Sequence, residues 1–122
     1  MVYNKLMDET KTETGLIAFE DFVKVKLKVG KILEAVPAEG SDKLIQLTVD
    51  IGEEKTRNIF AGIVKWYTPE ELVGKNVIVV ANLQPKRMMN SYSEGMLLAA
   101  DTEDKPILLT TSEPVLAGAK IR

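Results

Sequence analysis

The chain has 122 residues, 45% of them hydrophobic, and a formal net charge of −2 at pH 7. This length predicts one domain, and the absence of cysteine and histidine excludes disulfides, thiolate metal sites and imidazole bases. No apolar run approaches the roughly 20 residues that span a bilayer, and the polar N-terminus does not resemble a signal peptide, so we expect a cytoplasmic protein without a membrane partner.

Charge is segregated along the chain despite the small net value. Residues 22–31 contain four lysines and no acid, and residues 32–54 contain six acids and one lysine. The charged residues of 55–65 are all cations. Cationic blocks can therefore share one face while the total charge stays negative. Ordinary solvated strand faces would give the same pattern.

The first elements are an arm and a lysine-rich strand. Residues 1–18 show little periodicity and are predicted to form an N-terminal arm that contacts a partner subunit, ahead of a domain over residues 19–122. Residues 23–29 alternate aliphatic residues with lysine, which predicts a half-buried strand with its lysines on the open face. Gly30 interrupts the alternation and predicts a bulge or a sharp bend.

The middle of the chain contains a predicted hairpin. Residues 44–51 alternate again, so that one face consists of aliphatic side chains. A short turn leads to a third strand over residues 56–63. Two strands joined in this way form a hairpin.

A short helix and further strands follow. Thr68 is suited to the N-cap, Pro69 to the first helical position and Glu71 to a capping box, and Gly74 ends the helix. The remaining strands are predicted over residues 76–83, 96–100 and 107–109.

The predicted order of three strands, a short helix and two strands is the connectivity of the OB-fold. This all-β fold is a five-stranded Greek-key barrel that commonly binds oligonucleotides. An SH3-like barrel is the main competitor, and the capped helix between strands three and four favours the OB-fold. Fold alone does not establish function.

The loop over residues 82–95 carries side chains that hydrophobic packing does not require. It contains an amide, two adjacent cations, a hydroxyl and soft or aromatic groups: Asn82, Lys86, Arg87, Met88, Met89, Tyr92 and Ser93. Cations beside stackable side chains suit an anionic, partly unstacked ligand. Each also has an ordinary explanation: Asn82 could cap a turn, the cations could be solvated, and Met96 on the next strand fits a core position better than a contact. No catalytic constellation and no phosphate-binding glycine loop is present, so we expect a non-catalytic chain without cofactors.

These residues resemble a known family. The segments FEDFVKVKLKVGKI, EGSDKLIQLTVDIG, RNIFAGIVKWYTPEELVGKNVIVVANLQPKR and SEGMLLAA are similar to the OB-fold tRNA-binding module of methionyl-tRNA synthetases. The module occurs at the C-terminus of the synthetase, as a β subunit, as a stand-alone tRNA-binding protein and in an export-related chaperone. The specific signal is the combination of YTPEELVGK, ANLQPK and SEGM.

The resemblance implies a homodimer that binds tRNA by its shape and helps a synthetase to hold it, without chemistry of its own. The implied RNA-contacting positions are Asn82, Lys86, Ser93 and Met96, with Lys43, Arg57 and Arg87 as additions. A chaperone-like, peptide-binding dimer of the same fold is the alternative. Lys26 stands where the family usually has an acid, which makes the first strand more basic here. Ser91 stands where a glycine is common, which bears on the backbone between Met89 and Ser93 and so on the geometry of contact.

Overall fold

The computed structural model describes residues 15–122, so most of the predicted arm lies outside the described residues. The main sheet consists of β1 (Leu27–Pro37), β2 (Ile45–Asp50), β3 (Arg57–Ala61), β4 (Asn76–Val80), β7 (Met96–Leu97) and β10 (Lys120–Ile121). Two small hairpins are formed by β5 (Lys86–Met88) with β6 (Ser91–Ser93), and by β8 (Ala99–Asp101) with β9 (Pro106–Leu108). Within residues 15–122 the helices are α2 (Phe19–Phe22) and α3 (Pro69–Leu72), and neither is long and apolar enough to cross a membrane.

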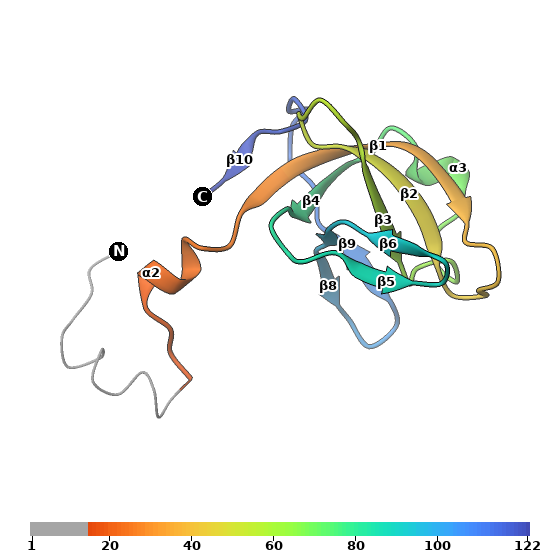
Figure 1. Ribbon diagram of the computed structural model, residues 1–122, viewed down its shortest axis with the longest axis horizontal. Coiled ribbons are helices and arrows are strands. Elements are labelled where there is room, and N and C mark those ends of the chain that lie inside the picture. Colours follow the sequence, from red (N-terminus) through yellow and green to blue (C-terminus); the bar gives the residue numbers. More distant parts are fainter. Residues whose placement is uncertain (1–14) are drawn as a thin grey trace.

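The main sheet curls into a nearly closed barrel (Figure 1). Its strands follow the order β3-β2-β1-β4-β7, with β10 added beside β1. β7 pairs with β4 and contacts β3, which brings the two ends of the sheet together. With α3 inserted between β3 and β4, this is the predicted OB-fold.

The barrel interior is filled by the predicted aliphatic face of the second strand. Ile45, Leu47, Val49 and Ile51 are fully buried, and β2 pairs with β3 as the predicted hairpin. Leu72 of α3 joins this core. The helix begins as predicted, because the Thr68 hydroxyl accepts from the Glu71 N–H and the Glu71 carboxylate accepts from the Thr68 N–H.

The first strand of the structure begins later in the chain than predicted. The amides of Val23 and Val25 donate to the carbonyls of Phe19 and Phe22 in a turn that continues from α2, and β1 starts at Leu27. Both valines are 44% exposed. The alternation of valine and lysine there does not reflect a buried sheet face, so the prediction of a strand over residues 23–26 is wrong.

The predicted bulge at Gly30 is also wrong. Gly30 pairs regularly with Val77, and the irregularity of β1 against β2 falls between Ile32 and Glu34. A Cβ atom on Gly30 would lie 2.7 Å from Val49 Cγ1 and 2.9 Å from the Cγ2 atom of Val79. The glycine therefore meets a packing requirement inside the barrel, and the bulge lies beyond it.

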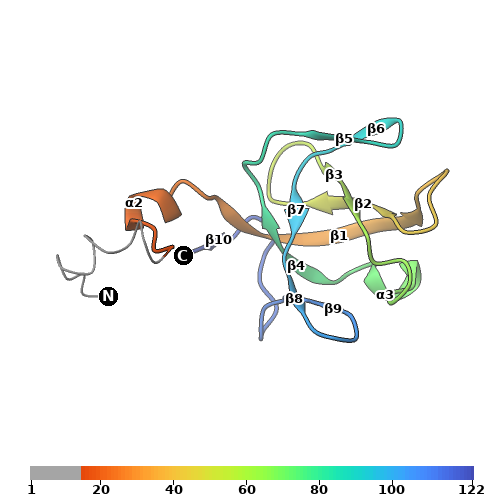
Figure 2. The same cartoon turned by 90° about the horizontal axis from the view of Figure 1, so that it is seen from below.

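The end of the chain is more divided than predicted. The expected strand over residues 96–100 is divided into β7 and β8, with Leu98 between them. The Leu98 N–H still donates to the Ile78 carbonyl of β4, whereas β8 pairs with β9. The expected loop over residues 82–95 contains the β5–β6 hairpin, and β10 had no clear sequence signal. Figure 2 shows the β5–β6 and β8–β9 hairpins on opposite sides of the barrel.

Candidate nucleic-acid interface

The β5–β6 hairpin is the centre of the candidate site. In its register Lys86 is opposite Ser93, Arg87 opposite Tyr92 and Met88 opposite Ser91. The hairpin turns at Met89, which has a left-handed φ of 56°. The Met89 methyl carbon lies 3.0 Å from the position that a Cβ on Gly40 would occupy, so the tip of the hairpin lies beside the β1–β2 loop (Figures 1 and 2).

The outer face of the hairpin combines a cation with an aromatic ring. Arg87 and Tyr92 are directly opposite each other, and the guanidinium carbon lies 5.7 Å from the ring centroid. Tyr92 is 50% exposed. A planar cation over an exposed ring offers both a phosphate contact and a stacking surface.

Two further predicted cations and Met96 are also at the surface. Lys86 is exposed on β5, and Lys43 is exposed in the β1–β2 loop that the hairpin tip approaches. Met96 is 48% exposed. Its expected core position is therefore wrong, and its thioether is free to meet a ligand.

Ser93 is placed differently, because its hydroxyl is already bonded within the protein. Its side chain is buried, accepts from the Phe60 N–H at 3.0 Å and donates to the Gly95 carbonyl at 3.1 Å. The hydroxyl thus fastens β6 to β3. Contact between Ser93 and RNA stays a prediction.

Asn82 also has protein partners for its amide. Its Oδ1 accepts from the Lys26 N–H at 2.8 Å, and its Nδ2 donates to the Lys24 carbonyl at 2.6 Å. These bonds join the end of β4 to the segment before β1. The amide fixes the point where the chain leaves the barrel toward the hairpin, and its contact with RNA stays a prediction.

Arg57 makes four hydrogen bonds through its guanidinium group. Nε and Nη2 donate to the two carboxylate oxygens of Glu53, at 2.9 and 3.0 Å. Nη1 donates to the carbonyls of Ala81 and Glu94, at 2.9 and 2.8 Å. The hydrogen bond from Arg57 lowers the pKa of Glu53 below its ordinary value. The predicted phosphate contact of Arg57 remains a prediction.

The structure thus brings the predicted residues to one side of the barrel in two roles. Four of them present exposed side chains: Lys43, Lys86, Arg87 and Met96. The side chains of Arg57, Asn82 and Ser93 are bonded to the protein, although Asn82 is also exposed. Sequence reasoning missed Asn58, whose amide contacts β6, because a single asparagine within a strand carries no distinguishing pattern. In the described part of the chain, no group of three or more acidic side chains could hold a metal ion.

Comparison with known proteins decides the family. Residues 27–120, which span the barrel from β1 to β10, match the family model described as "Putative tRNA binding domain". The chain belongs to this family. The match begins where β1 begins and includes the whole hairpin.

Similar curated proteins are methionine–tRNA ligases. One from Caldanaerobacter subterraneus is 53% identical over 93% of this chain and 18% of its own length. Another from Methanocella arvoryzae is 44% identical over 97% of this chain and 17% of its own length. The chain therefore spans less than a fifth of the length of these relatives.

Solved structures share the fold closely. A methionyl-tRNA synthetase-related protein from Pyrococcus horikoshii has a TM-score of 0.81 and 41% identity, covering 88% of this chain and 98% of that one. The chaperone CsaA from Bacillus anthracis has a TM-score of 0.79 and 30% identity, covering 88% and 99% of the two chains.

The Ser93 bonds give a first stability prediction. Ser93→Ala would leave the Phe60 N–H buried without its acceptor, so we expect a loss of about 1–3 kcal/mol in the free energy of unfolding. Urea unfolding followed by circular dichroism measures it. Ser112→Ala is the control, because Ser112 is exposed and such sites usually change stability by less than about 0.5 kcal/mol. Equal midpoints for Ser93→Ala and the control would contradict the structural role of the hydroxyl.

Proposed function

We propose that this chain is a non-catalytic tRNA-binding module that helps an aminoacyl-tRNA synthetase, methionyl-tRNA synthetase above all, to hold its tRNA in the cytoplasm. The observation that carries this proposal is the exposed hairpin of Arg87, Tyr92 and Lys86 on a barrel of the tRNA-binding family. The synthetase relatives support the choice of partner.

The exposed groups suit folded RNA. Lys43, Lys86 and Arg87 supply positive charge for phosphates along one side of the barrel. Tyr92 and Met96 offer soft surfaces for unstacked bases, and a base stacked on an aromatic side chain contributes about 1–3 kcal/mol. RNA displays such bases at loops and ends, so a hairpin that combines both features would recognise shape more than sequence.

The test is a titration of labelled tRNA with the protein at about 50 and 200 mM salt, with duplex DNA as competitor. The proposal predicts binding that weakens steeply as salt rises, because released counterions drive phosphate contacts, and that resists the DNA. Absence of binding by the folded protein at either salt concentration would refute it.

A second candidate is a chaperone-like, peptide-binding protein, and a specific observation favours it. The structural neighbour from Bacillus anthracis is a chaperone, and Met89, Tyr92 and Met96 are exposed here. Flexible methionines accommodate varied apolar partners. Peptide binding through them would change little with salt, whereas RNA binding would fall.

The proposed module is a homodimer that pairs through its terminal segments. A groove of about 530 Å³ lies between α2, the start of β1 and the last three residues of the sequence. Its lining includes Phe22, Val25 and Ile121. Phe19 and Phe22 are 57% and 44% exposed. Aromatic side chains of this size are typical anchors of an interface.

The dimer gives a separate prediction. Phe22→Asp would place a charge in the proposed interface, so we expect the mass measured by light scattering to fall from that of a dimer to that of a monomer. Glu70→Lys, on the exposed side of α3, is the control for a change of charge elsewhere. A wild-type mass of one chain at all concentrations would contradict the dimer while leaving the tRNA proposal standing.

A further inference from the structure

The hairpin is attached to β3 mainly through side chains. β3 is the first strand in the sheet order, so one of its edges lacks a continuous ladder. The Phe60 N–H donates to Ser93 Oγ at 3.0 Å, and the Asn58 N–H donates to Glu94 Oε1 at 2.9 Å. The Glu94 N–H in turn donates to the Asn58 carbonyl at 2.7 Å. The position of the hairpin therefore depends on these particular residues.

The Asn58 side chain links three strands. Its Nδ2 donates to the Tyr92 carbonyl at 2.8 Å and to Ser91 Oγ at 3.3 Å. Its Oδ1 accepts from Gln46 Nε2 at 2.8 Å, which orients the amide from β2. Tyr92 is held through its own backbone carbonyl, and its side chain remains half exposed.

Arg57 holds together the two ends of the segment that contains the β5–β6 hairpin. The chain leaves the barrel after Ala81 and returns at Glu94, and a single guanidinium nitrogen donates to both carbonyls. Glu53 binds the other edge of the guanidinium through both carboxylate oxygens and so fixes its plane. The Arg57 side chain is only 21% exposed, and a lysine has no planar fork with which to bridge three partners.

We propose that Arg57 and Asn58 are positioning residues, which set the orientation of the β5–β6 hairpin for RNA and do not themselves bind it. This inference rests on the proposed function for its RNA part. Its structural part concerns the free protein and stands separately. A preset hairpin meets its ligand without the ordering cost that a loose one would incur.

Arg57→Lys tests the inference because it keeps the charge and removes the bridge. We expect hydrogen exchange of the amides in residues 86–93 of the free protein to rise about 10-fold, the size expected for the loss of a charged hydrogen bond. We expect tRNA affinity to fall about 5–10-fold with no change in the slope of log K against log salt, since no phosphate contact is lost. Asn58→Ala should likewise raise the exchange of the hairpin amides and lower tRNA affinity without changing the salt slope.

Direct phosphate contact by Arg57 predicts the opposite pattern. Arg57→Lys would then keep its affinity and its hairpin exchange, and Arg57→Ala would reduce the salt slope by about one unit. Either result would overturn the inference. Lys86→Ala is the matched control, because it should lower the slope while leaving the hairpin exchange unchanged.

Glu53→Ala provides a milder variant if the Arg57 and Asn58 variants fold poorly. It removes an anion, so electrostatics alone would strengthen RNA binding. A positioning role for Arg57 predicts faster hairpin exchange and weaker binding despite the more positive charge, and tighter binding would overturn it. If the wild-type protein binds no tRNA, the proposed function fails, and the exchange measurements still decide whether Arg57 holds the hairpin.

Discussion

Gly30→Ala is expected to destabilise the protein by about 1–3 kcal/mol, the usual cost of overpacking a filled core. The added methyl group would lie 2.7 Å from Val49 Cγ1 and 2.9 Å from the Cγ2 atom of Val79, closer than packed carbon atoms approach. Both valines belong to the buried core between β1, β2 and β4. The free energy of unfolding in urea measures the effect, and Gly30→Val should have a larger one.

Gly62→Ala is the matched control for this prediction. A Cβ on Gly62 would have no atom within 4 Å, so the same substitution should be neutral or stabilising by about 0.4–1 kcal/mol through the unfolded state. Similar unfolding midpoints for Gly30→Ala and Gly62→Ala would contradict the packing requirement assigned to Gly30.

The double variant Lys86→Ala/Arg87→Ala is expected to lower tRNA affinity by about 10–100-fold at low salt, as the loss of two phosphate contacts predicts. The slope of log K against log salt should become shallower by about 0.7–0.9 for each cation. Removal of Arg87 also removes the group over the Tyr92 ring. Fluorescence anisotropy with labelled tRNA over a range of salt concentrations measures both quantities.

Lys105→Ala is the control for the double variant. Lys105 is exposed in the turn between β8 and β9, on the side of the barrel opposite the β5–β6 hairpin (Figure 2). Its loss changes the net charge in the same direction without touching the proposed interface. Equal losses of affinity per charge in the two variants would show that general electrostatics, rather than the hairpin, attracts RNA.

The barrel could be predicted largely because its signals are local. The alternation in β2 and the capping box of α3 depend on residues close in sequence, and both are present in the structure. The start of β1 could not be predicted, because alternation of valine and lysine reads as a strand even where the valines are exposed. The pairing of β10 with β1 joins residues about ninety positions apart and leaves no local pattern.

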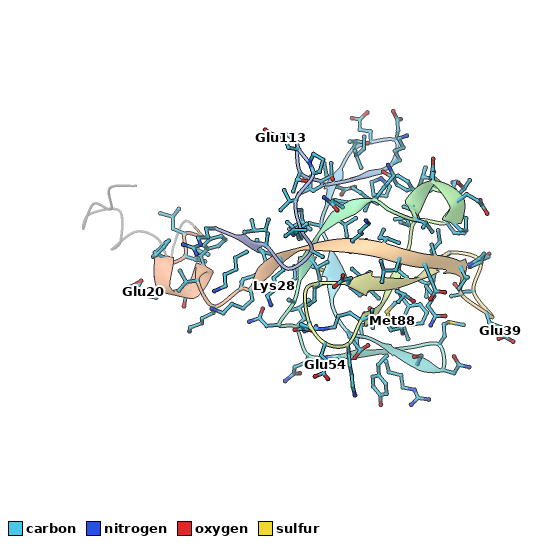
Figure 3. The ribbon with its side chains drawn as sticks, turned by 90° about the horizontal axis from the view of Figure 1, so that it is seen from above. Glu20, Lys28, Glu39, Glu54, Met88 and Glu113 are labelled. Atoms are coloured by element: carbon cyan, nitrogen blue, oxygen red, sulfur yellow. The ribbon has the colours of Figure 1, made fainter. Side chains whose placement is uncertain are left out.

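The sequence indicated candidate residues but not how their side chains would be held. The sequence resemblance selected residues that the structure brings to one side of the barrel, and Arg87 and Tyr92 are opposite each other on the hairpin. Which polar side chains would be bonded within the protein could not be read from the sequence. Ser93 is bonded to an amide on β3, and Asn82 to the backbone before β1. Met88, expected in a loop, lies on β5 and is half-buried, and Figure 3 shows it between the hairpin and the barrel.

Hydrogen exchange measured by mass spectrometry, with and without saturating tRNA, tests most directly whether the hairpin is the RNA-binding surface. We expect added protection of peptides that cover residues 82–96 and of the β1–β2 loop around Lys43, with no change in residues 99–109 on the opposite side. Protection confined to residues 99–109, with the hairpin unchanged by bound tRNA, would contradict the assignment of this surface.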